Sequence, residues 1–163
     1  MVLFPLRSRP MCMQLFSKRL KDLMDLEGES NRSLSMKTNL DRKSIRCWLT
    51  GKFFPKYDAL IKLATHFKVR VDYLIGLEEV LENEPYASDN ATPIEEVPQR
   101  FLSLIKEYME ENHLTNYAMA KKLKMDQKAF TKWLKKGSMP ETATLIKLVH
   151  ATGISANTLL GRE

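Results

Sequence analysis

The side chains in this sequence best suited to chemistry are cations on one face of a short predicted helix. The helix spans residues 42–50, between Asp41, a good N-cap, and Gly51, which tolerates the left-handed backbone that ends a helix. Its apolar stripe, at helical spacing, consists of Ile45, Trp48 and Leu49. The opposite face and the exposed N-terminal end carry Arg42, Lys43, Arg46 and Cys47. So short a helix must pack on a larger body, and its basic face then remains free to bind an acidic partner.

The same pattern occurs again 85 residues later in the chain. A second helix is predicted over residues 127–136, between Asp126 and Gly137, with Trp133 at the position of Trp48. The register holds well beyond the helix, without a gap, as the following pairs show: Phe16 and Phe101, Asn31 and Asn116, Lys37 and Lys122, Pro55 and Pro140, and residues 60–63 and 145–148. This period is longer than that of a solenoid unit, so the repeat indicates a duplicated domain.

Each copy is predicted to contain five short helices, and no stretch alternates as a strand would. The expected helices span residues 14–26, 31–37, 42–50, 56–67 and 71–75 in the first copy, and 101–112, 116–122, 127–136, 141–152 and 156–160 in the second. Residues 1–13 are expected to be irregular. Trp48 and Trp133 are both expected to be largely buried against the second and fourth helices of their own copy. The predicted fold is all-α, with two domains at 14–77 and 99–161.

Charge separates these domains from the segment between them. Residues 31–56 and 116–140 each carry seven basic residues and one acidic residue, whereas residues 78–96 carry seven acidic residues and no basic one. The acidic segment also contains prolines, so residues 78–98 are predicted to be a linker with no core of its own. The chain as a whole has a net charge of +6. Basic patches at matched positions are typical of proteins that bind a polyanion.

Other classes of protein fit the sequence poorly. The three histidines, His66, His113 and His150, lie on different predicted elements, and no acidic, histidine or cysteine cluster has ligand spacing. We therefore expect no enzyme activity, no metal and no cofactor. The apolar runs are too short to span a membrane, and two cysteines at unrelated spacing fit a reducing compartment. We expect a cytoplasmic protein without a small-molecule ligand.

The residues around each basic helix resemble a known motif. The first copy supplies Leu34, Ser35, Asn39, Leu40, Ile45, Trp48, Gly51 and Pro55, and the second supplies Met119, Ala120, Lys124, Met125, Phe130, Trp133, Gly137 and Pro140. This pattern is similar to the helix-turn-helix of the Cro/C1-type (phage repressor-like, XRE) DNA-binding family. The resemblance implies two tandem five-helix lambda-repressor-like domains. It covers nearly all of residues 14–77 and 99–161.

A helix-turn-helix of this kind implies a particular set of DNA contacts. The helix before the reading helix begins at a short amide side chain, Asn31 or Asn116, which with the adjacent backbone N–H groups can hold a phosphate. The reading helix presents its front to base edges in the major groove of double-stranded DNA. The candidates on the two fronts are Arg42, Lys43, Arg46 and Cys47, and Gln127, Lys128, Thr131 and Lys132. Lysines in or beside the following loop are expected to contact phosphates, namely Lys52, Lys56, Lys135 and Lys136.

The resemblance is typical of a repressor-type transcriptional regulator, with a homodimer as one possible state. The alternative is a protein-interaction or dimerisation module, in which one helix-turn-helix copy no longer binds DNA. Apolar residues on a reading-helix front would favour that alternative. Both fronts are cationic or polar, which favours DNA binding by both copies.

Overall fold

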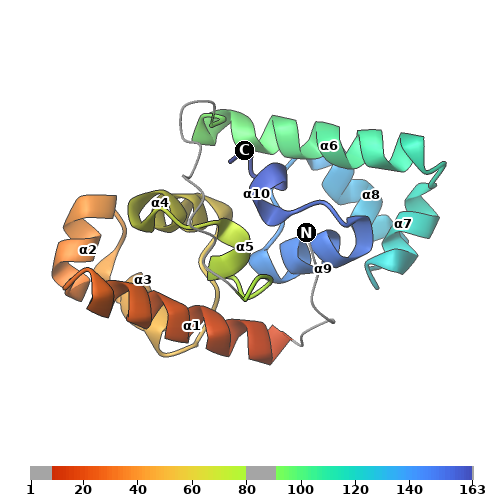
Figure 1. Ribbon diagram of the computed structural model, residues 1–163. Helices are drawn as coiled ribbons and strands as arrows, with labels where there is room; N and C mark the ends of the chain where they lie inside the picture. Colours follow the sequence, from red (N-terminus) through yellow and green to blue (C-terminus); the bar gives the residue numbers. More distant parts are fainter. Residues whose placement is uncertain (1–8, 80–90, 163) are drawn as a thin grey trace. The chain divides into compact units, whose positions relative to one another are not determined.

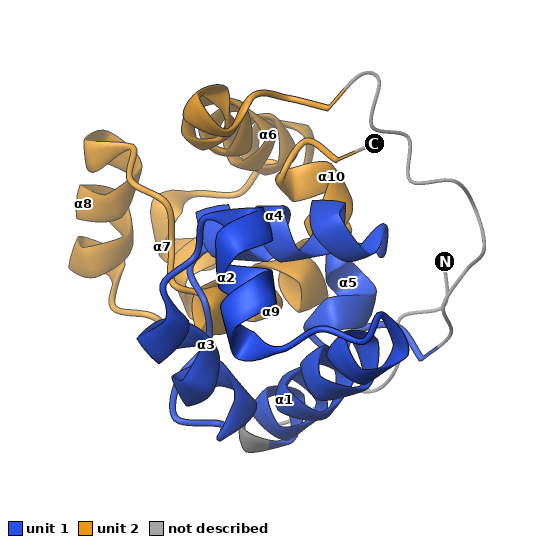
Figure 2. Cartoon of the chain, turned by 90° about the vertical axis from the view of Figure 1, so that its left-hand side faces the viewer, with its two compact units in different colours: residues 1–86 blue, residues 87–163 orange. Residues whose placement is uncertain are grey.

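The computed structural model of the protein describes residues 9–79 and 91–162. These residues form ten α-helices and one short 3-10 helix, and no strand occurs among them (Figure 1). The all-α fold class predicted from the sequence is therefore confirmed. The chain divides into two compact units, residues 1–86 and 87–163, which Figure 2 shows in different colours.

The first unit is built from five helices whose apolar faces share one core. They are α1 (Arg9–Leu26), α2 (Asn31–Thr38), α3 (Arg42–Leu49), α4 (Tyr57–Phe67) and α5 (Val71–Leu74). Helix α3 contacts both α1 and α2, while α5 contacts α1 and α4. The core contains Phe16, Leu20, Leu34, Ile45 and Leu60, all fully buried. The short basic helix is therefore held by its apolar stripe, as its length requires.

The second unit has the same sequence of α-helices after a single 3-10 turn. It consists of η1 (Ile94–Glu96), α6 (Val97–Glu111), α7 (Asn116–Lys122), α8 (Gln127–Lys136), α9 (Thr142–Thr152) and α10 (Ala156–Leu159). Helix α7 packs on α8, and α10 packs on α6 and α9. The largest buried side chains are Phe101, Ile105 and Phe130.

Helix bounds predicted by caps and stripes agree with the structure to within one residue, but α1 and α6 both begin earlier than predicted. Helix α1 starts at Arg9 instead of residue 14, because the buried Cys12 extends the stripe of Phe16 and Leu20 toward the N-terminus. Helix α6 starts at Val97 instead of residue 101. A proline is tolerated in the first turn, where its missing N–H would have no partner within the helix.

Part of the predicted linker belongs to the folded units. The Thr92 N–H donates to the Gly161 carbonyl at 2.9 Å, and the Arg162 guanidinium donates to the Thr92 carbonyl. These bonds fix residues 91–93 against the end of the second unit. On the other side, the Arg70 Nε donates to Glu78 at 3.2 Å. Residues 80–90 lie outside the described part of the chain, as do residues 1–8 of the predicted irregular segment.

The turn before each basic helix contains a residue with positive φ, and neither is glycine. Asn39 has φ 54° and Lys124 has φ 52°. Asparagine tolerates this left-handed region better than other non-glycine residues, and lysine pays the full steric cost of its Cβ. At Lys124 the turn is closed by backbone bonds from Lys124 N to Lys121 O and from Met125 N to Ala120 O, the pattern that typically places glycine at this position.

Lys124→Gly is therefore expected to stabilise the second unit, by roughly 0.5–1 kcal/mol, because the relief of left-handed strain exceeds the added chain entropy. Asn39→Gly is the matched control and should gain less. Urea unfolding of the two variants and the parent measures both effects. Equal gains, or a loss at Lys124, would contradict this explanation of the second turn.

Candidate nucleic-acid interface

The two basic helices are capped in the same way. The Asp41 carboxylate accepts from the Ser44 N–H at 2.9 Å, and the Asp126 carboxylate accepts from the Ala129 N–H at 3.1 Å. The bond from the Ser44 backbone lowers the pKa of Asp41 below its usual value, so this cap is anionic at neutral pH. Each carboxylate stabilises the positive end of its helix dipole and fixes where the helix begins.

The charged candidate side chains on α3 and α8 are exposed to solvent. In the first unit the exposed candidates are Arg42, Lys43, Arg46 and Lys52, while Cys47 is half-buried. In the second unit the exposed candidates are Gln127, Lys128, Lys132 and Lys135, while Thr131 is half-buried. A polyanion could therefore reach most of these groups without any rearrangement of the helices.

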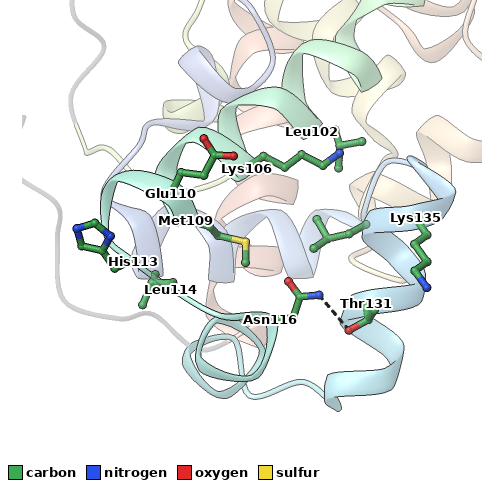
Figure 3. Close-up of a pocket in the computed structure, with 10 residues that line it drawn as sticks. Leu102, Lys106, Met109, Glu110, His113, Leu114, Asn116, Thr131 and Lys135 are labelled. Carbon is green, nitrogen blue, oxygen red and sulfur yellow. Dashed lines mark hydrogen bonds between the residues drawn. The ribbon is translucent and has the colours of Figure 1, made fainter.

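Helices α2 and α7 are each capped by the side chain of the residue that precedes them. Ser30 forms a reciprocal capping box with Ser33, and the Thr115 hydroxyl accepts from the Ala118 N–H at 3.1 Å. Asn31 and Asn116 are the first residues of these helices, and both are half-buried. Asn116 and Thr131 are brought together, with the Asn116 amide donating to the Thr131 hydroxyl at 3.4 Å (Figure 3).

A groove of about 680 Å³ in the second unit connects this pair to the rest of α8. Figure 3 shows its lining residues, which come from α6, the start of α7 and α8. Lys135, a predicted contact residue, lines the groove together with Asn116 and Thr131. Lys106 of α6 also lines it and was not among the residues predicted for the site. Its match with Lys21 across the repeat was the available signal.

Gln127 lies on a different hollow, of about 490 Å³, between α7 and the start of α8. The cations that line this hollow are Lys121 and Lys124, and the exposed ring of Tyr117 lines it as well. None of these three residues was predicted for the site, because the predicted residues lie on the front of α8, at the start of α7 and beside the loop after α8. Of the candidates of the second unit, Asn116, Thr131 and Lys135 thus line one hollow and Gln127 lines the other.

One prediction about the cores of these units is wrong. Trp48 is buried, with 4% of its surface exposed, but Trp133 is only half-buried. The Trp133 Nε1 donates to the Ser138 carbonyl at 2.6 Å, so the loop after α8 holds the ring at the edge of the core. The ring still packs edge-on against Phe101, with centroids 6.0 Å apart.

A cluster of ionisable groups around the buried Glu29 carboxylate links α2 of the first unit to α4. Only 3% of the Glu29 side chain is exposed, and its Oε1 accepts from the Lys37 Nζ at 2.9 Å and lies 2.8 Å from the His66 Nε2. Burial opposes ionisation of the carboxyl, but the hydrogen bonds from Lys37 and His66 outweigh it, so the pKa of Glu29 is lowered. The matched residue in the second unit is Leu114, so this cluster belongs to the first unit.

Because of this cluster, the first unit should become less stable as the pH falls into the acid range. Because the pKa of Glu29 is lower in the folded state, its contribution is complete above the ordinary glutamate range and is lost as pH falls through the lowered value. Glu29→Gln should destabilise the first unit at neutral pH and flatten its acid dependence. Unfolding can be followed by Trp48 fluorescence in a Trp133→Phe background. The exposed Glu141→Gln is the control, and an equal flattening there would contradict the assignment.

Among the described residues, no group of three or more His, Cys, Asp or Glu side chains could hold a metal ion. None of the helices in residues 9–79 and 91–162 is long and apolar enough to cross a membrane.

Comparison with known proteins identifies part of this architecture. Residues 105–159 match the family model described as Helix-turn-helix, a segment that includes the C-terminal part of α6 and all of α7, α8, α9 and α10. No curated protein and no solved structure matches the chain. The match therefore lies within the second unit, and the matched segment includes both α7 and α8.

Proposed function

We propose that the protein is a sequence-specific regulator of transcription that binds double-stranded DNA through both units, with α3 and α8 each in a major groove. The observation that carries this proposal is the repeat. An exposed basic helix front follows a capped helix that begins with asparagine in both units. The family match covers one of these copies. We assign the same role to the other on its residues, and take 14–77 and 99–161 as the two domains.

The candidate residues divide into two kinds of contact. Asn31 and Asn116, at the start of α2 and α7, are placed to hold phosphates together with the adjacent N–H groups. Lysines near the end of each reading helix, such as Lys52 and Lys135, add phosphate contacts that carry no sequence information. The helix fronts read base edges, where arginine and lysine pair with guanine and glutamine pairs with adenine.

The two fronts differ, so the two units should read different sequences. Arg42 and Lys43 match guanine in the first unit, whereas Gln127 matches adenine in the second. A single chain then recognises an asymmetric site. A homodimer would recognise a palindrome whose half-sites each have two parts. The resemblance to Cro/C1-type regulators supports repression as the mode of action.

Selection of bound DNA sequences by full-length variants tests this proposal. Arg42→Ala and Gln127→Ala should each relax one or two base pairs, at different places in the site, at a cost of about 1–3 kcal/mol for each bidentate pair removed. Lys147→Ala, an exposed lysine on α9, is the control and should leave the preferred sequence unchanged.

Loss of preference at the same positions in both variants, or in neither, would refute separate reading by the two helices. If only Gln127→Ala changes the preference, the first unit does not read DNA. The alternative of an interaction module in the first unit would then hold.

A further inference from the structure

The hollow between α7 and the start of α8 contains two cations that the reading helix does not supply. Lys121 lies near the end of α7 and Lys124 in the turn after it, and both are exposed and line this hollow of about 490 Å³. The backbone bond from the Lys124 N–H to the Lys121 carbonyl, 3.1 Å long, closes the turn that carries both lysines. Gln127 lines the same hollow, so a polyanion that reaches Gln127 from this side also meets the two lysines.

The ammonium groups of these two lysines are available to an external anion. Neither group forms an ion pair or a hydrogen bond with another residue in the described ranges 9–79 and 91–162. The neighbouring Lys122 differs, because its Nζ donates to the Tyr108 hydroxyl of α6 at 3.1 Å. Asp126 also lines the hollow, but its carboxylate accepts from the Ala129 N–H at 3.1 Å, at the positive end of the α8 dipole. The hollow therefore presents positive charge that is not neutralised by an ion pair.

Lys124 also has a backbone conformation that disfavours any side chain. Its φ of 52° lies in the left-handed region, where glycine would avoid the steric cost of a Cβ. A residue held in so costly a conformation is a candidate for a functional side chain. The first unit lacks the pair of lysines, since the matched residues are Met36 and Asn39, and asparagine tolerates a positive φ better than lysine. Strain and unneutralised charge thus coincide at one residue of the second unit.

We propose that this hollow is a further phosphate-binding site for the DNA backbone, separate from the start of α7 and from the loop after α8. The ammonium groups of Lys121 and Lys124 neutralise one or two phosphates there. The hydroxyl of Tyr117, an exposed residue that lines the hollow, donates to a phosphate oxygen. Such contacts carry no sequence information, so they raise affinity and fix the orientation of α8 in the major groove. The inference rests on the proposed function and adds residues to it that lie outside the predicted site.

Ethylation interference on a duplex selected by the full-length parent tests the proposal, because ethylation removes the charge of a single phosphate. Lys121→Gln with Lys124→Gln should abolish the interference at one or two phosphates and leave the preferred sequence unchanged. The slope of log affinity against log salt should fall by about 2. Lys147→Gln removes an exposed cation from α9 and should change neither result.

The outcomes separate this site from DNA binding itself. If the parent selects a preferred sequence and the double variant keeps every interference position, the further phosphate site is refuted and the proposed function stands. A parent that binds no duplex would overturn both.

Lys124→Gly distinguishes a lysine that binds DNA from one with a structural role only. The glycine relieves the left-handed strain, so the second unit should become more stable in urea, while the salt slope falls by about 1 because one phosphate contact is lost. Asn39→Gly, at the matched turn of the first unit, should leave the slope unchanged. Tyr117→Phe removes only a hydroxyl and should weaken duplex binding at the parent's slope. A Lys124→Gly variant that gains stability and keeps the slope of the parent would overturn the proposal.

Discussion

Trp48→Ala is expected to destabilise the first unit by about 3–5 kcal/mol, as loss of a large buried aromatic side chain does. Trp48 is buried where α3 meets the core, and the backbone at this point is also tied to α1, since the Ser17 hydroxyl donates to the Trp48 carbonyl at 2.6 Å. A loss of this size is a large fraction of the stability of a small domain. Trp133→Ala should cost less, because that ring is less completely buried than Trp48.

The two tryptophans also provide the measurement. In Trp48→Ala the remaining fluorescence comes from Trp133, so urea unfolding by fluorescence should report an intact second unit, while circular dichroism shows that the first unit unfolds early. Trp48→Phe should be far milder, because it keeps most of the apolar surface and removes the unpaired N–H. If Trp48→Ala unfolds like the parent, then α3 is not anchored by this ring.

The second large effect is the dependence of DNA affinity on salt. Each basic half carries seven cations, and if about half of them contact phosphates, the whole chain neutralises roughly 6–10. Duplex affinity should then fall by about 10³–10⁵ between 50 and 200 mM salt, because each neutralised phosphate releases condensed counterions. Fluorescence anisotropy of a labelled duplex measures this directly. A fall of less than tenfold would be too small for two engaged units.

Local signals in the sequence were sufficient to predict the helices that carry the site. The cap at Asp126 and the stop at Gly137 are decided within a few residues of chain, and α8 spans the predicted residues. Because the same pattern recurs 85 residues apart, the prediction of each basic helix supported the prediction of the other. The start of α6 could not be predicted in this way, because Pro98 reads as a breaker until the burial of Val97 is known.

Features that depend on contacts distant in sequence were not predictable. Trp133 has the same local pattern as Trp48, and its exposure follows from the path of the loop that brings Ser138 to its N–H. Glu29 reads as a polar residue at the end of a helix, yet it is buried by a contact with His66, 37 residues away. Likewise, Lys106 enters the candidate interface only because α6 and α8 line one groove.

The most direct test of DNA binding by both units is the salt dependence of two matched double variants of the full chain. Lys52→Gln with Lys56→Gln removes two exposed cations from the first unit, and Lys135→Gln with Lys136→Gln removes two from the second. Each pair should lower the slope of log affinity against log salt by about 2, roughly one for each phosphate that is no longer neutralised. If either pair leaves the slope of the parent unchanged, the corresponding unit does not bind DNA, and the proposal that both units do so is contradicted.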